Sequence, residues 1–199
     1  MGKVQLFVSK LNEDLDKYDF LFDLVSEERR EKALRYKIKK DQIRSLIAGY
    51  LMEKTLKTKE FLINENGKPY VKDSIYFNVS HSGNYVCLAL SSFEVGIDIE
   101  EILNKDYSFI EKFFKVNNLS KNKAYSLWTN SESFVKCLGT GIKDIKNIPL
   151  LTKEGEHVYK NKRYFTKNFI IDNHSFSITI EDNHDFEIEQ IEIDIKKPN

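Results

Sequence analysis

The order in which helices and strands are predicted constrains the fold of this chain more than any other feature, because helical patterns precede strand patterns twice. The turn signal Asn66-Gly67-Lys68-Pro69 separates the first helical region from its strands. In chain order, the predicted elements are a helical region over 26–52 that breaks near 36–40, strands over 75–80, 85–90 and 95–100, helices over 108–116 and 121–138, and strands over 163–171 and 175–180. This order predicts an α+β fold in two halves of similar size.

The end of the chain carries one further strand pattern, over residues 186–195. Its apolar residues change register between Ile188 and Ile191. Because alternate residues of a strand face opposite sides, such a slip predicts a bulge or a turn at that point.

The composition gives no sign of a nucleic-acid or membrane partner. The 31 lysines and arginines balance the 31 aspartates and glutamates, so the formal net charge is zero. No apolar run approaches the roughly 18 residues that a membrane-spanning helix needs. The first residues lack the layout of a signal peptide, and two cysteines cannot form a disulfide framework. We therefore expect a cytoplasmic protein.

Charge is nevertheless uneven along the chain. Seven basic residues lie between Arg29 and Lys40, and seven acidic residues lie between Glu181 and Asp194. Runs of this kind are typical of solvated faces, and the acidic run keeps that interpretation. The basic run has a second interpretation, which depends on the motifs below.

The segment Gly96-Ile97-Asp98-Ile99-Glu100 places two carboxylates on one face of a predicted strand. Asp98 and Glu100 would lie roughly 7 Å apart, given the rise of a strand. Carboxylates at that separation repel each other unless a cation lies between them, and Mg²⁺ binds one or two carboxylates together with phosphate oxygens. The alternative is an ordinary amphipathic strand with a solvated acidic face.

Two other segments contain polar groups that suit a phosphate ligand. Glu132 and Lys136 are one turn apart on the predicted helix, as either a surface ion pair or a metal carboxylate beside a phosphate-binding ammonium. Ser80 and His81 end a predicted strand, where hydroxyl, imidazole and backbone amides can hold a phosphate. The alternative for His81 is a purely structural histidine.

The motifs occur in the order Gly67-Lys68-Pro69, Phe77–Gly83, Gly96–Glu100 and Trp128–Lys136. This order and spacing resemble the surfactin-type 4′-phosphopantetheinyl transferases. That family shows a Gly-Lys-Pro turn, then F-N-[IV]-S-H-S, G-[IV]-D-[IV]-E and W-[ST]-x-K-E-[SA]-x-x-K. The resemblance extends back to Arg29 and forward to Ile142, and it weakens after about Ile180.

The resemblance implies two α+β halves with pseudo-twofold symmetry, here residues 1–95 and 96–199, with coenzyme A in the cleft between them. It implies a magnesium or manganese ion bound by Asp98, Glu100 and Glu132. It also implies phosphate contacts from Ser80, His81 and Lys136. The positions that match contacts to the 3′-phosphate and adenine end of coenzyme A are Arg29, Lys32, Arg44, Ser45 and Lys68.

The implied reaction transfers the 4′-phosphopantetheine group of coenzyme A to a serine of an apo-acyl or peptidyl carrier protein and releases 3′,5′-ADP. Lys136 and His81 would stabilise developing charge. Glu132 would bind the metal first, and second would orient or deprotonate the serine. The double-length arrangement implies a monomer, and the sequence does not name the carrier.

The chain departs from the family pattern at Ser131, where the family usually has lysine. A missing cation beside the phosphates favours an alternative, a non-catalytic coenzyme A-binding relative with the same pocket. The segment 113–123 is also short for the family. A third hypothesis is an interaction domain whose acidic tail binds a basic partner.

Overall fold

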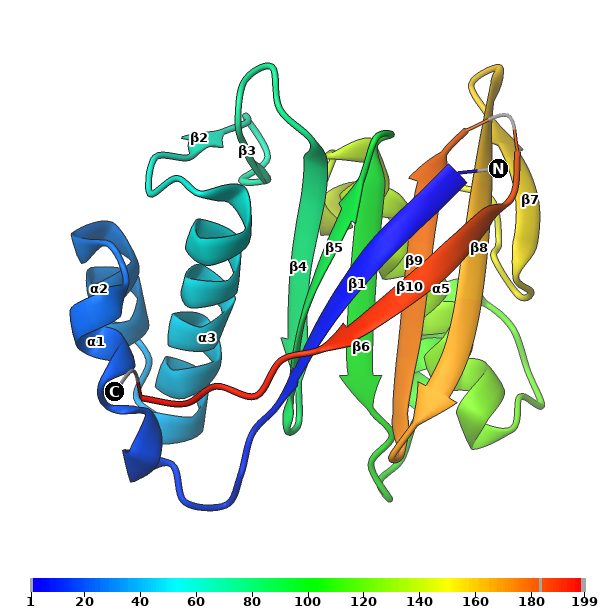
Figure 1. Ribbon diagram of the computed structural model, residues 1–199. Helices are drawn as coiled ribbons and strands as arrows, with labels where there is room; N and C mark the ends of the chain where they lie inside the picture. The colour runs from blue at the N-terminus through cyan, green and yellow to red at the C-terminus, as the bar shows by residue number, and fades with distance from the viewer. Residues whose placement is uncertain (1, 183, 198–199) are drawn as a thin grey trace.

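Helices and strands alternate in two rounds along the chain (Figure 1). The structure is a computed structural model that describes residues 2–182 and 184–197. Its strands are β1 (Gly2–Lys10), β2 (Leu62–Ile63), β3 (Pro69–Tyr70), β4 (Tyr76–Ser82), β5 (Tyr85–Ser91), β6 (Val95–Glu101), β7 (Gly155–Tyr159), β8 (Lys162–Ile171), β9 (His174–Glu181) and β10 (Phe186–Glu192). Its helices are α1 (Leu21–Leu24), α2 (Glu27–Leu34), α3 (Lys39–Leu56), α4 (Ser108–Phe114) and α5 (Lys121–Leu138), with 3-10 turns η1 (Asp16–Tyr18) and η2 (Ile142–Asp144).

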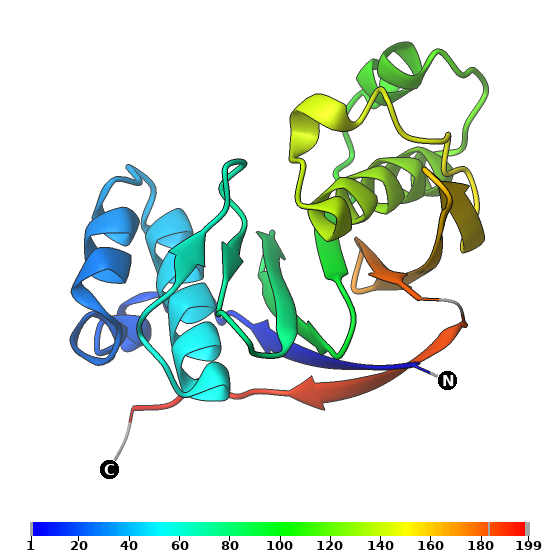
Figure 2. The ribbon, with the colours of Figure 1, turned by 90° about the horizontal axis from the view of Figure 1, so that it is seen from above.

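The larger strands form two four-stranded sheets, with the orders β10-β1-β5-β4 and β6-β9-β8-β7. In each half a helix of 18 residues packs against neighbouring strands, α3 against β4 and β5 and α5 against β6 and β9. Figure 2 shows α1–α3 on one side of the molecule and α4 and α5 on the other, with β4 and β6 between them. The prediction of an α+β fold is therefore confirmed.

Apolar side chains form three buried clusters that hold these layers together. One lies between the first sheet and α1–α3 and includes Leu46 and Phe77. The second joins the two sheets and includes Ile97, Ile99 and Phe176. A third packs under α5 around Phe134 and Tyr164. Because Ile97 and Ile99 face the second cluster, the alternate residues of β6 lie on the opposite face, toward α5. The sequence pattern predicted the shared face of Asp98 and Glu100 but not the helix that covers it.

The basic helix α2 is capped by Ser26, whose hydroxyl accepts a hydrogen bond from the amide of Arg29 at 3.4 Å. The buried carboxylate of Glu53 fixes Ser26 by accepting hydrogen bonds from its amide and its hydroxyl. The helix ends at Leu34, and α3 begins at Lys39, so the predicted break near 36–40 is confirmed. This break lets α2 turn back and pack against α3.

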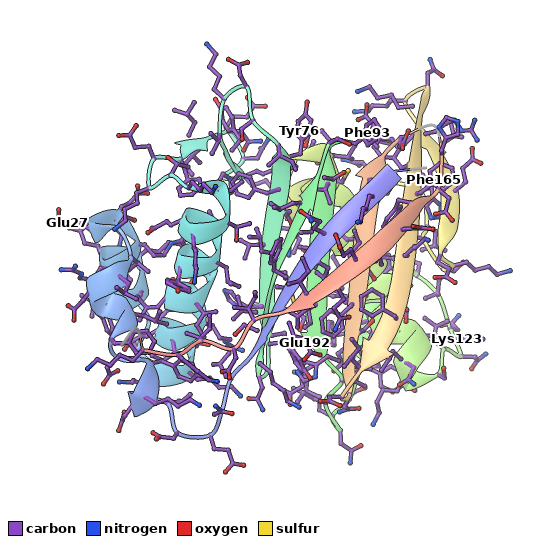
Figure 3. All side chains as sticks on the ribbon, in the orientation of Figure 1. Glu27, Tyr76, Phe93, Lys123, Phe165 and Glu192 are labelled. Carbon is purple, nitrogen blue, oxygen red and sulfur yellow. The ribbon has the colours of Figure 1, made fainter. Side chains whose placement is uncertain are left out.

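The prediction of a bulge or a turn between Ile188 and Ile191 is wrong. β10 pairs with β1 in parallel without interruption, from Gly2 opposite Phe186 to Val8 opposite Glu192. β10 is an edge strand, so its side chains need not alternate strictly between a core and solvent. Figure 3 labels Glu192 at its end. β10 lies within residues 96–199 but belongs to the sheet of the first half. The division into halves at residues 1–95 and 96–199 stays a prediction.

Among the helices of residues 2–182 and 184–197, none has the length and apolar character needed to cross a membrane.

Candidate active site

A cavity of about 350 Å³ lies between the two halves. Its walls come from the basic helix α2, from α3, from strands β4 and β6, and from α5. The lining residues are Arg29, Lys32, Tyr36, Ser45, Ala48, Val79, Ser80, His81, Asp98, Ile99, Glu100, Glu132 and Lys136. Most of the residues singled out from the sequence therefore meet in one cavity. Tyr36 was missed, because it falls in the break between two helices and belongs to none of the motifs.

The cavity forms where β4 and β6, each the edge strand of its sheet, come together. Side chains rather than backbone groups join these two edges. Asn78 accepts a hydrogen bond from the amide of Ile97 at 3.0 Å. Ser82 donates to Glu100 at 3.1 Å and accepts from the amide of Glu101 at 3.0 Å. These contacts fix the register of β6 against β4 and so fix where Asp98 and Glu100 lie.

Asp98 is the buried centre of the acidic end, with only 4% of its surface exposed. Its Oδ1 accepts hydrogen bonds from the hydroxyl of Ser80 at 3.1 Å and from the ammonium of Lys136 at 2.6 Å. Its Oδ2 is buried and has no hydrogen-bond partner among the described residues. Burial opposes the charge on Lys136, but Asp98, Glu132 and Glu100 outweigh it and raise the pKa of this ammonium. Lys136 therefore stays charged.

Glu100 and Glu132 complete the acidic end. Burial and the charge of Asp98 raise the pKa of Glu100 to about 7, and the same two causes raise the pKa of Glu132. Three carboxylates that repel one another, with one buried oxygen lacking a partner, provide the hard oxygen donors that Mg²⁺ prefers. Within the described residues, however, no group of three His, Cys, Asp or Glu side chains is already arranged to hold a metal ion. The residue types fit, but the side chains are not yet gathered.

Gly96 lets α5 lie close to β6. A Cβ at Gly96 would lie 2.0 Å from the carbonyl oxygen of Ser133 and 2.3 Å from the amide nitrogen of Cys137. Only the absence of a side chain lets the backbone of α5 approach β6 at this distance. Gly96 thereby allows Lys136 to reach Asp98.

The opposite end of the cavity is basic. Neither Arg29 nor Lys32 forms an ion pair with a carboxylate within the described part of the chain. Burial lowers the pKa of both, and the charge of Arg29 further lowers that of Lys32. The stem of Arg29 lies over Gly49, where a Cβ would be 2.3 Å from its Cγ. The hydroxyl of Ser45 is buried and has no hydrogen-bond partner in the part of the chain that the structure describes. These groups suit an anionic ligand.

His81 lies between the two ends. Burial, with the nearby charges of Arg44 and Lys136, lowers its pKa to about 4. The imidazole is therefore neutral at pH 7 and can donate one hydrogen bond and accept another.

We expect the substitution His81→Gln to reduce the loss of stability on acidification. Because the pKa of His81 is about 4 in the folded chain and near 6.5 in an ordinary setting, the unfolded chain binds more protons between these values. Stability is therefore lost as the pH falls through this window, by up to about 3 kcal/mol. Urea unfolding at pH 7 and pH 4.5 measures the difference. The exposed His184→Gln should behave like the wild type, and equal acid losses in all three proteins would contradict the assignment.

Two residues that the sequence matched to coenzyme A do not line this cavity. The guanidinium of Arg44 pairs with Asp41 and donates to the carbonyl of Gly83 at 3.2 Å. Lys68 lies at the far end of β4, where it pairs with Glu94 at 2.7 Å. The sequence motif could not reveal this, because it gives the position of Lys68 in the turn but not its partner.

Ser131 also lies elsewhere than the sequence suggested. It is fully buried, and its hydroxyl donates to the carbonyl of Leu127 at 2.8 Å. Successive helical residues point about 100° apart, so Ser131 faces the interior while Glu132 faces the cavity. The hydroxyl of Ser131 therefore takes no part in the lining of the cavity.

Comparison with known proteins adds relatives of stated activity. A family profile described as "4′-phosphopantetheinyl transferase, N-terminal" matches residues 12–93. The 4′-phosphopantetheinyl transferase gsp of Aneurinibacillus migulanus is 37% identical over 156 residues, which cover 69% of this chain and 66% of that protein. A 4′-phosphopantetheinyl transferase of Bacillus subtilis is 32% identical over 162 residues, covering 70% and 72%. The L-aminoadipate-semialdehyde dehydrogenase-phosphopantetheinyl transferase of Xenopus laevis is 30% identical over 139 residues, covering 58% and 45%. The chain thus spans about two thirds of the length of its relatives, 66% of the Aneurinibacillus migulanus protein and 64% of the 4′-phosphopantetheinyl transferase ffp of Bacillus subtilis.

Proposed function

Since the chain belongs to the 4′-phosphopantetheinyl transferase family, we propose that it transfers the 4′-phosphopantetheine group of coenzyme A to a serine of an apo-acyl or peptidyl carrier protein. The observation that supports this most is the polarity of the cavity. At one end lie Arg29 and Lys32, which have no ion-pair partner among the described residues, and at the other lie three carboxylates with a buried ammonium. A nucleotide diphosphate ester with its counter-ion matches that distribution of charge.

The basic end would bind the nucleotide of coenzyme A. Arg29 and Lys32 provide cations without carboxylate partners in the described chain, and Ser45 provides a free buried hydroxyl. Burial makes each cation costly without a counter-charge, so a phosphate would relieve that cost. Arg44 and Lys68 lie outside the lining, so we do not include them in this contact set.

The acidic end would hold a divalent cation, Mg²⁺ or Mn²⁺, through Asp98, Glu100 and Glu132. When bound, the cation would neutralise charge on the diphosphate. Asp98 has one carboxylate oxygen free for this purpose, while Lys136 and Ser80 hold the other. Within the described residues these carboxylates are not grouped around one point, so Glu100 and Glu132 would turn toward the ion when it binds.

In the proposed step, the serine oxygen of the carrier attacks the β-phosphorus of coenzyme A, and the bond from that phosphorus to the bridging oxygen breaks. The serine proton would pass to the carboxylate of Glu132, as the second role of a residue that first binds the cation. Lys136 and the neutral imidazole of His81 donate hydrogen bonds to the charge that develops on phosphate oxygens. The products are the holo-carrier and 3′,5′-ADP.

The alternative of a non-catalytic coenzyme A-binding relative rested on Ser131. Since the Ser131 hydroxyl faces the core and not the cavity, that observation no longer favours it. The cytoplasmic location and the monomeric state stay predictions from the sequence, which does not name the carrier.

The test is a transfer assay with coenzyme A, Mg²⁺ and a panel of apo-carriers from fatty-acid, polyketide and peptide synthesis, followed by intact-mass measurement. We expect at least one carrier to gain the mass of phosphopantetheine, and a chelator to abolish the gain. If no carrier is modified while coenzyme A binds tightly, transferase activity is excluded for these acceptors and binding alone remains.

A further inference from the structure

The turn that contains Lys68 belongs to the first half, but its polar side chains contact the end of α5 in the second half. Asn64 and Asn66 each donate a side-chain hydrogen bond to the carbonyl of Gly139, at 3.0 and 3.1 Å. Lys68 donates to the carbonyl of Cys137 at 3.3 Å. We call these three side chains the clasp. Tyr76 and Phe93, labelled in Figure 3, mark this end of the molecule.

Hydrogen bonds within the turn fix its conformation independently of its contacts with α5. The side-chain oxygen of Asn64 accepts from the amides of Asn66 and Lys68, at 2.9 and 2.8 Å. The amide of Gly67, whose φ of +88° few other residues adopt, donates to the carbonyl of Asn64. A turn held in this way can present three donors together without a large entropic cost.

The end of α5 needs such donors. The last carbonyls of a helix have no partner within it, and the helix dipole leaves this end negative. Gly139, in the left-handed conformation, donates back to Val135 and Lys136. The clasp supplies further donors, among them a cation. Lys68 is only 14% exposed and also binds Glu94 and the carbonyl of Val95, at the junction of the two halves.

The position of the clasp matters for the cavity because α5 carries Glu132 and Lys136. Lys136 is in the last turn, next to Cys137, to which the clasp is bonded. The turn that contains Lys68 also borders a small hollow, whose walls include Gly67 and Pro69 as well as Arg29 and Lys32 of the main cavity. One face of the turn therefore borders the basic end, and the other face holds the catalytic helix.

We propose that Lys68, with Asn64 and Asn66, is a positioning residue that fastens the end of α5 to the first half and is not a phosphate contact. This inference rests on the proposed transferase function and concerns the same site. Loss of the clasp would let the last turn of α5 shift, and so move Lys136 and Glu132 from Asp98. Small misplacements of this kind lower the rate of chemistry more than they weaken substrate binding.

The test compares Lys68→Met, which keeps the stem but removes the donors, with Lys32→Ala in the cavity. We expect Lys68→Met to lower kcat about 10- to 100-fold. The Kd for coenzyme A, measured by calorimetry without metal, should change less than about threefold. Lys32→Ala should instead raise the Kd for coenzyme A more than it lowers kcat. Lys68→Arg, which keeps a cation and its donors, should restore part of kcat. If Lys68→Met fails to fold, the exposed Asn66→Ala is a milder break and should lower kcat about threefold.

Hydrogen exchange gives a readout that does not depend on activity. Lys68→Met should speed exchange of the amides at 136–140 about tenfold, while Lys32→Ala leaves them unchanged. A rise in the Kd for coenzyme A with kcat and exchange intact would overturn the inference and restore Lys68 as a ligand contact. If the wild type modifies no carrier, the proposed function fails, and exchange alone decides whether the clasp holds α5.

Discussion

The substitution Asp98→Asn is expected to lower kcat about 1,000-fold while leaving the fold intact. Asparagine has the same shape, so it can still accept from Ser80 and Lys136 through its oxygen. It removes the charge that offsets Lys136 and replaces the unpartnered Oδ2 with a group that cannot bind a cation. The measurement is kcat at saturating coenzyme A and Mg²⁺, together with thermal unfolding.

The matched control is Glu101→Gln. Glu101 directly follows Glu100 in β6 and does not line the cavity. This variant removes the same charge from the same strand and should keep kcat within about twofold. Metal-dependent stabilisation provides a second readout, since adding Mg²⁺ to the coenzyme A complex should raise the unfolding temperature of the control further but not that of Asp98→Asn. Normal turnover by Asp98→Asn would show that this carboxylate is not required.

The substitution Gly96→Ala is the second change expected to have a large effect. The added methyl group would lie 2.0 Å from the backbone of Ser133 and 2.3 Å from that of Cys137. Backbone atoms cannot turn aside as a side chain can, so α5 must move away from β6. We expect a loss of about 3 kcal/mol of stability and a fall in kcat of about 100-fold, as Lys136 withdraws from Asp98.

Gly155→Ala is the control that replaces a glycine where the added methyl group causes no steric clash. An added Cβ at Gly155 meets nothing within 4 Å, although its φ of +117° strains any other residue. This variant should lose stability but keep kcat. Chemical denaturation and kinetics on both variants decide the point. Wild-type kcat in a folded Gly96→Ala would show that close contact between α5 and β6 is not needed for catalysis.

The elements that determine the site could be predicted because local signals agree there. The range 121–138 coincides with α5, since helical spacing persists to the glycine that ends it. The alternation over Val95–Glu100 placed Ile97 and Ile99 in a core and Asp98 and Glu100 on the other face. Both carboxylates and Glu132 then line one cavity, although their convergence as metal ligands stays a proposal.

The features that could not be predicted from the sequence depend on contacts between residues far apart in the chain. β1 was not predicted, and its parallel neighbour β10 lies more than 180 residues away, so no local turn signals the pair. The motif around Lys68 suggested a contact with nucleotide, whereas its neighbours in space are Glu94 and the end of α5. The depth at which Asp98 is buried was also hidden, because an alternating strand indicates a face but not what covers it.

The most direct test of the central claim is anomalous diffraction from crystals grown with coenzyme A and Mn²⁺. The account predicts one anomalous peak in the cavity between the two halves, about 2 Å from carboxylate oxygens of Asp98, Glu100 and Glu132 and beside the diphosphate. A peak bound by other side chains, or coenzyme A lying outside this cavity, would contradict it.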